Sequence, residues 1–145
     1  MVHFTLPLQG STIRNIAESS SKKQAINHVF SSSDAPQVNI LSSTYSVNVG
    51  SSVTLQCTIS ANPVHTTVYW KKIVNGVSTD VDIGSSSNRY GGSTVNSPSL
   101  IISNAVTSDE GFYVCYATNS VGTGQSSQTF LDVIGSKFYY KCSKN

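Results

Sequence analysis

The sequence contains few charged residues. Asp, Glu, Lys and Arg make up 11% of the 145 residues, against about 25% in typical soluble domains. The formal net charge is +2, and the basic residues are scattered along the chain rather than clustered. A nucleic-acid-binding surface requires concentrated positive charge. We therefore expect no nucleic-acid partner.

Long hydrophobic runs are also absent. No stretch of about 18 apolar residues occurs, so we expect no membrane insertion within this chain. Residues 1–8 hold a few apolar side chains broken by His3 and Pro7, without the basic run and apolar core of a signal peptide. A fragment of a longer secreted or membrane protein, an expressed piece, or a wrongly placed start explains this beginning, and we favour a fragment or an incomplete start.

Patterns that support catalysis or metal binding are missing. The three histidines, at positions 3, 28 and 65, lie far apart and have no Cys or carboxylate at ligand spacing. Neither Asp80 with Asp82 nor Asp109 with Glu110 resembles a general acid/base pair. The sequence also lacks a nucleophile elbow, a phosphate loop and a dinucleotide fingerprint. We expect no enzyme activity, no cofactor and no metal site.

The strongest positive signal is a pair of cysteines in two strand-like segments. Residues 53–59 alternate between apolar and polar side chains, and residues 113–117 place Tyr113, Cys115 and Ala117 on one face. Cys57 and Cys115 therefore sit on inward faces, where a disulfide can join two sheets through the core. The alternative is a pair of free, buried thiols. Closing a loop of about 59 residues contributes roughly 4 kcal/mol in the chain-entropy account.

Further motifs surround the two cysteines and together identify a family. Trp70 follows Cys57 by thirteen residues, and Asp109-x-Gly111-x-Tyr113-x-Cys115 leads into the second cysteine. With Gly50-x-x-Val53-x-Leu55-x-Cys57, Leu100-x-Ile102, Ala117-x-Asn119-x-x-Gly122 and Leu131-x-Val133, the segment from about 36 to 133 resembles the immunoglobulin superfamily. It is most similar to the I-set domains of invertebrate adhesion and matrix proteins such as hemicentins.

The exact set within the superfamily stays open, because Arg89-Tyr90-Gly91-Gly92-Ser93 also resembles the start of strand D in variable-type domains. The resemblance implies an all-β, immunoglobulin-like Greek-key β-sandwich of two antiparallel sheets with one intersheet disulfide. It further implies that Trp70 packs against the bridge and that the Tyr113 hydroxyl bonds to main chain a few residues upstream. We expect a salt bridge between Arg89 and Asp109. The expected core residues are Leu55, Trp70, Leu100, Ile102, Tyr113 and Ala117.

Turn signals divide the chain into strands and flanks. We expect strands near 37–42, 45–49, 52–60, 67–73, 79–83, 89–95, 98–103, 111–119 and 125–134. Asn75-Gly76 predicts a hairpin turn, and the glycines at 122 and 124 predict positive φ in the loop before the last strand. The domain is expected at 36–134, with a disordered or weakly helical segment at 1–35 and a C-terminal tail at 135–145.

Side-chain alternation also predicts a binding face. If Trp70 and Cys115 point inward, the residues before and after each of them along the strand point outward. The two strands are neighbours in this fold, so these residues share one surface, and Phe130 joins them. The candidate face consists of Tyr69, Lys71, Val114, Tyr116 and Phe130. Exposed aromatic patches often mark interfaces; the alternative is an aromatic sheet face without a partner. The loops at 62–67 and 119–124 are a second candidate.

These observations favour an extracellular domain that mediates protein–protein recognition or cell adhesion, either secreted or part of a membrane protein's ectodomain. Its partner would be another protein, with homophilic binding as one option. A soluble innate-immune receptor and a structural spacer of an extracellular matrix protein are the alternatives. Cys142 is left without a partner in the sequence, so it indicates either an interchain disulfide or a free thiol.

Overall fold

The computed structural model describes residues 33–84 and 89–135. The expectations for residues 1–32, for most of the C-terminal tail and for Cys142 lie outside the described residues. The described part contains eleven strands and one short 3-10 helix, η1. Their bounds are β1 (Asp34–Ile40), β2 (Thr44–Asn48), β3 (Val53–Leu55), β4 (Cys57–Asn62), β5 (Thr67–Val74), β6 (Val77–Asp80), β7 (Tyr90–Gly92), β8 (Leu100–Ile102), η1 (Thr107–Asp109), β9 (Gly111–Thr118), β10 (Thr123–Gln125) and β11 (Thr129–Ile134).

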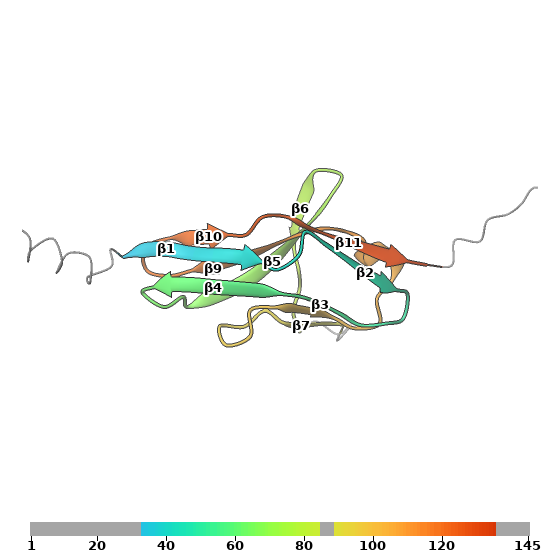
Figure 1. The fold of residues 1–145 in the computed structure, drawn as a ribbon, viewed down its shortest axis with the longest axis horizontal. Coiled ribbons are helices and arrows are strands. Elements are labelled where there is room, and N and C mark those ends of the chain that lie inside the picture. Colours follow the sequence, from blue (N-terminus) through green and yellow to red (C-terminus); the bar gives the residue numbers. More distant parts are fainter. Residues whose placement is uncertain (1–32, 85–88, 136–145) are drawn as a thin grey trace, which may run out of the picture. The chain divides into compact units, whose positions relative to one another are not determined.

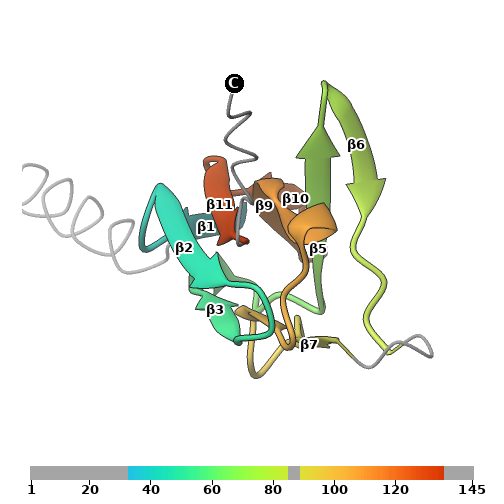
Figure 2. The same ribbon diagram turned by 90° about the vertical axis from the view of Figure 1, so that its right-hand side faces the viewer.

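The strands form two layers that face each other (Figures 1 and 2). One layer has the strand order β2-β11-β9-β5-β6, with β10 added beside β9. The other layer contains β3-β8-β7 and the pair β1-β4. The β2–β11 pair is parallel, and the other pairings are antiparallel. This arrangement confirms the all-β immunoglobulin-like sandwich that the sequence predicts.

A disulfide and a tryptophan lie at the centre of the sandwich. Cys57 in β4 is bonded to Cys115 in β9, with 6.7 Å between their Cα atoms. Trp70 in β5 is the cross-strand partner of Cys115 and has no exposed surface, and its indole N–H donates to the Pro98 carbonyl at 2.8 Å. The disulfide joins the two layers, as predicted. All six expected core residues are buried: Leu55, Trp70, Leu100, Ile102, Tyr113 and Ala117.

Two of the predicted strands are each divided in two. The segment expected at 52–60 pairs first with β8 and then, after Gln56, with β1. At the change of partner the Gln56 N–H donates to the Tyr45 hydroxyl at 3.1 Å instead of to a neighbouring strand. The segment expected at 125–134 contains the last residue of β10 and all of β11. Between them, the Ser126 N–H donates to the Cys115 carbonyl and the Ser126 hydroxyl accepts from the Cys115 N–H, so the strand is interrupted there. Single-strand predictions missed both interruptions.

The turn residues were partly predicted. Asn75 and Gly76 have positive φ of 51° and 78° and form the hairpin turn between β5 and β6. The second strand of the hairpin therefore begins at Val77, rather than at 79 as expected. Gly122 and Gly124 are absent from the positive-φ residues, so the expectation for them was wrong. Gly124 is needed for close approach instead, because a Cβ there would lie 1.7 Å from the Pro36 carbonyl oxygen.

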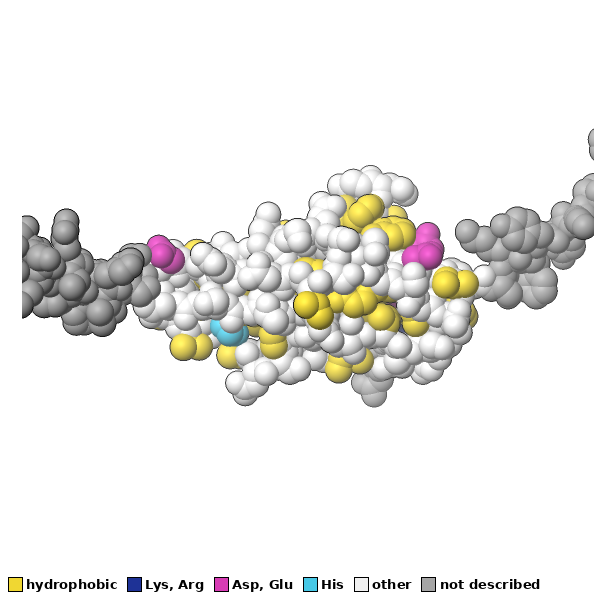
Figure 3. Space-filling view, viewed as in Figure 1, with side chains coloured by type: hydrophobic (Ala, Val, Ile, Leu, Met, Phe, Trp, Pro, Cys, Tyr) yellow, Lys and Arg dark blue, Asp and Glu magenta, His cyan; other side chains and the backbone are white. Residues whose placement is uncertain are grey.

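The ends of the described domain lie far apart. The strand β1 begins at one end of the long axis and β11 ends at the opposite end (Figure 1). On the face shown in Figure 3, most of the surface is backbone or side chains that are neither charged nor hydrophobic, with few charged side chains and small hydrophobic patches. This agrees with the low charge content of the sequence.

Candidate functional site

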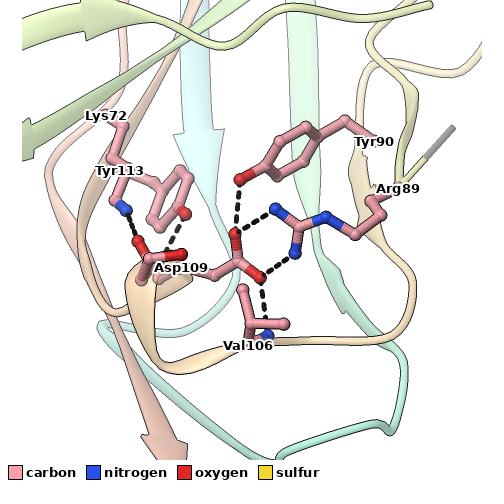
Figure 4. Close-up of polar contacts among 7 residues, drawn as sticks. Lys72, Arg89, Tyr90, Val106, Asp109 and Tyr113 are labelled. Carbon is pink, nitrogen blue, oxygen red and sulfur yellow. Dashed lines mark hydrogen bonds and ion pairs between the residues drawn. The ribbon is translucent and has the colours of Figure 1, made fainter. Parts of the chain in front are cut away.

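A buried carboxylate organises the turn that leads into β9 (Figure 4). Asp109 at the end of η1 is 1% exposed. Its Oδ2 accepts from Arg89 Nη1 at 2.6 Å and from the Val106 N–H at 2.8 Å. Its Oδ1 accepts from the Tyr90 hydroxyl at 2.5 Å and from Arg89 Nη2 at 3.3 Å. Four donors therefore satisfy the carboxylate, as a buried charge requires.

The hydrogen bonds decide the protonation state of this cluster. Burial alone would raise the pKa of Asp109, but the bonds from Tyr90, Val106 and Arg89 outweigh burial and hold the pKa below its ordinary value. Burial first, and then the bond to Asp109, raise the pKa of Tyr90 to about 12. The bond to Asp109 raises the pKa of Arg89. The carboxylate is therefore ionised and the phenol neutral at physiological pH.

The same turn holds Tyr113 and Lys72. The Tyr113 hydroxyl donates to the Asp109 carbonyl at 2.7 Å, which gives the corner that the resemblance implies. The Lys72 ammonium donates to the Ser108 carbonyl, and burial lowers the pKa of Lys72 although the Asp109 charge opposes this. These groups bond one another and main chain and leave no free nucleophile or base. We interpret the cluster as structural: it fixes the start of β9.

The outer face of the layer β11-β9-β5-β6 carries two aromatic pairs. Tyr69 and Tyr116 are cross-strand partners whose rings stack at a centroid distance of 5.0 Å and an angle of 6°. Phe112 and Phe130 are also cross-strand partners, with centroids 5.0 Å apart and tilted by 54°. The Lys71 ammonium lies 6.0 Å from the Tyr69 ring centre and 5.9 Å from that of Tyr116. Tyr69, Lys71, Tyr116 and Phe130 are all partly exposed.

Val114 does not belong to the accessible surface, which corrects the prediction. It alternates with buried Tyr113 and Cys115, so it does point toward the outer face, but only 4% of it is exposed. Val114 lies opposite Lys71 and between Phe112 and Tyr116 on the central strand. A short side chain among longer ones is covered by them. Alternation gives the direction of a side chain and not its exposure.

Phe112 is the residue that the sequence analysis missed. It is 44% exposed and pairs with Phe130 on one side and with Ile73 on the other. The face therefore has a tyrosine end and a phenylalanine end. The signal was present, because Phe112 has the same parity in its strand as Tyr116. The prediction placed Tyr69, Tyr116 and Phe130 in one patch, but the cross-strand partner of Phe130 is Phe112, four residues before Tyr116.

The two loops of the second candidate are tied together. Asn119 is 6% exposed, and its amide donates to the carbonyls of Asp34 and Pro63 at 2.8 and 2.9 Å. Its carbonyl accepts from the main-chain N–H groups of Val121 and Gly122. Asn119 therefore uses its whole hydrogen-bonding capacity within the fold. It also ties the two loops to each other and to the start of β1.

Within residues 33–84 and 89–135, no group of three or more His, Cys, Asp or Glu side chains is placed to hold a metal ion. No helix in these ranges has the length and hydropathy needed to cross a membrane.

Comparisons with known proteins give consistent results. The sequence profile described as immunoglobulin domain matches residues 35–119, which is more than half of the chain. No curated protein matches the chain. A solved structure described as the structural basis for Dscam isoform specificity is 28% identical, with a TM-score of 0.59 over 71% of this chain and 25% of that chain.

Two other structures are similar over about the same share of the chain. The tandem Ig repeats of Dlar are 31% identical, with a TM-score of 0.56 over 73% of this chain and 52% of that one. A marsupial T cell receptor is 22% identical, with a TM-score of 0.58 over 70% of this chain and 52% of that one, and so shares the fold alone. The chain thus spans a quarter of the first of these structures and about half of the other two.

Proposed function

The chain belongs to the immunoglobulin domain family, and from this premise we propose that it is an extracellular module that binds another protein without catalysing a reaction. The observation that carries the proposal is the aromatic outer face of β11-β9-β5-β6, defined from here on as Tyr69, Lys71, Phe112, Tyr116 and Phe130. Aromatic side chains that are partly exposed on a rigid sheet are typical of protein interfaces.

The geometry of the face supports recognition in two ways. The stacked Tyr69 and Tyr116 rings hold each other in place, so little conformational freedom is lost when a partner covers them. Lys71 lies between the two aromatic pairs along the strand, near both tyrosine rings and within 3.3 Å of Asp80, so it adds a charged group to the aromatic face.

Similarity supports the same function at a finer level. The likeness to structures of Dscam and Dlar at more than 25% identity favours a recognition or adhesion role outside the cell. We keep the I-set or variable-like assignment, and the similarity to hemicentin-like adhesion and matrix proteins, as part of this proposal. The boundaries 36–134 for the domain also remain a proposal.

Self-association tests the face, because a second copy of the chain is a defined probe. Sedimentation equilibrium over a range of concentrations, in reductant to exclude any disulfide through Cys142, would measure the dimer dissociation constant. We expect Tyr116→Ala to weaken the dimer at least about fivefold without lowering the unfolding midpoint, since exposed tyrosines at interface centres typically contribute more than 1 kcal/mol.

Ile101→Ala is the matched control. Ile101 is 39% exposed on β8 in the opposite layer, so its loss should leave association unchanged. Equal effects of the two variants, or an unaltered dimer with Tyr116→Ala, would rule out the aromatic face. A wild-type chain that stays monomeric at all concentrations would reject homophilic binding and favour the matrix-spacer alternative.

A further inference from the structure

The phenylalanine end of the aromatic face contains a small pocket. It has a volume of about 200 Å³ and is open to solvent, and it is lined by Ile73, Val74, Asn75, Glu110, Gly111, Phe112 and Phe130. The volume is below the roughly 300–1,000 Å³ of sites for small organic ligands. A pocket of this size is suited to one large apolar side chain rather than to a whole cofactor or metabolite.

The apolar walls of this pocket are exposed to an unusual degree. Val74 is 44% exposed and Phe112 is 44% exposed. Phe112 lies on the outer face, whereas Val74 has the same parity as buried Trp70 but is exposed at the end of β5. Val77, just across the hairpin turn from Val74, is 65% exposed. Figure 3 shows hydrophobic side chains gathered below the tip of the β5–β6 hairpin, with an acidic side chain beside them. Adjacent exposed apolar groups of this kind indicate a surface that another molecule covers.

The border of the pocket carries two carboxylates. Glu110 lines it directly and also interacts electrostatically with the Lys72 ammonium. Asp132 is exposed two residues beyond Phe130, on the same side of β11. In the described part of the chain neither carboxylate forms an ion pair. The Lys and Arg side chains that the structure describes already have partners: Lys71 pairs with Asp80, Arg89 pairs with Asp109, and Lys72 donates to the Ser108 carbonyl.

We propose that this pocket docks a segment of a partner protein that presents a large apolar side chain next to a Lys or Arg. The apolar side chain fills the space against Phe112 and Phe130, and the cation pairs with Glu110 and Asp132. The inference rests on the proposed function, since the pocket is one end of the aromatic face, and it adds the chemistry of the partner. Apolar burial supplies most of the affinity, and the carboxylates select the sign of the partner's charge.

Short peptides test this chemistry on the full 145-residue chain. The probes are acetyl-Gly-Lys-Phe-Lys-Gly-amide, its Glu-Phe-Glu counterpart and its Lys-Ala-Lys counterpart, titrated into ¹⁵N-labelled protein. We expect saturable shifts at the amides of Ile73, Gly111 and Phe112 with the first peptide, and an affinity in the range of about 1 mM. The Glu-Phe-Glu and Lys-Ala-Lys peptides should each bind several-fold more weakly.

Charge variants separate this inference from a merely sticky surface. Glu110→Gln should weaken Lys-Phe-Lys binding about 2- to 5-fold at low salt, because exposed ion pairs contribute up to about 1 kcal/mol. Glu110→Gln with Asp132→Asn should also flatten the salt dependence. Asp80→Asn is the matched control, since Asp80 already pairs with Lys71 and lies outside the pocket, and it should leave the affinity unchanged.

Three results would overturn the proposal. One is equal binding of the oppositely charged or Phe-less peptide, and another is saturable binding at other residues only, or none up to about 10 mM. The third is binding that is seen only after Lys137→Ala with Phe138→Ala, which would assign the pocket to the chain's own 136–145 segment. The proposed function stands separately, because the loss of self-association with Tyr116→Ala does not depend on Glu110.

Discussion

At the scale of single residues, Asp109 shows how a buried charge is made stable. Its carboxylate is 1% exposed and would be strongly unfavourable without partners. The sequence predicted the partner Arg89, because the pairing follows from a motif and a strand start. It did not predict the bonds from Tyr90 and from the Val106 N–H. Those bonds depend on how the turn at η1 folds against β7, which a linear sequence does not display.

Removing Arg89 should destabilise the fold. We expect Arg89→Ala to lower the free energy of unfolding by about 2–4 kcal/mol, since it leaves a buried carboxylate with fewer donors. Urea unfolding at neutral pH measures this. Lys71→Ala is the matched control: it breaks the exposed Lys71–Asp80 pair and should cost less than about 1 kcal/mol. Equal losses in the two variants would contradict the special role of Asp109.

The effect of Arg89→Ala should depend on pH in a defined direction. The pKa of Asp109 is lowered in the folded state, so its charged interactions stabilise the fold fully above the unfolded value of about 3.9. That contribution is lost as the pH falls through the folded pKa. The difference between wild type and Arg89→Ala should therefore be largest at neutral pH and shrink below about pH 4. A difference that grows toward acid would mean that the ion pair is not its source.

At the scale of elements, the sequence located every strand except β10, most of which it placed in the loop at 119–124, and it did not locate every strand boundary. Period-two alternation and turn residues are local signals, so they survive in a single sequence. The change of partner at Gln56 and the interruption at Ser126 depend on Tyr45 and Cys115, which lie eleven residues away along the chain. Gly124 was expected to have positive φ, but it is required because β10 passes close to the main chain of β1.

Two glycines of one loop should therefore respond differently to the same change. Gly124→Ala should destabilise the domain by about 1–3 kcal/mol, because its Cβ would lie 1.7 Å from the Pro36 oxygen and β1 must move away. Gly122→Ala should be nearly neutral, since its Cβ meets only the Ala35 Cβ at 3.4 Å. Denaturant midpoints of both variants decide the matter, and similar midpoints would show that β1 adapts without strain.

At the scale of the whole molecule, the cysteine pair and Trp70 were enough to predict the sandwich. Direction of side chains followed from the same signals, and so four of the five predicted face residues are accessible. The burial of Val114 and the position of Phe112 in the face could not be predicted from these signals, because they depend on the size of the cross-strand neighbours. A single sequence shows on which side of a strand a residue lies, while the exposed fraction of its side chain depends on how the sheet packs.

The disulfide should provide a large share of the stability of the whole domain. The bonded residues are separated by 58 positions, and the chain-entropy account gives roughly 4 kcal/mol for such a loop. We expect the double variant Cys57→Ala with Cys115→Ala to lose about 3–5 kcal/mol, measured by urea unfolding. Cys142→Ser is the control and should leave the midpoint unchanged. A small loss in the double variant would show that the two layers hold together without the bond.

The placement of the two ends of the domain has a mechanical consequence. Because β1 starts at one end of the long axis and β11 finishes at the other (Figure 1), tension between neighbouring modules would act along both terminal strands. The hydrogen bonds of the parallel β2–β11 pair would then be loaded in shear, all at once, instead of opening one by one. The covalent link between β4 and β9 would shorten the length of chain that a pull can draw out. We therefore expect the domain to resist stretching along this axis.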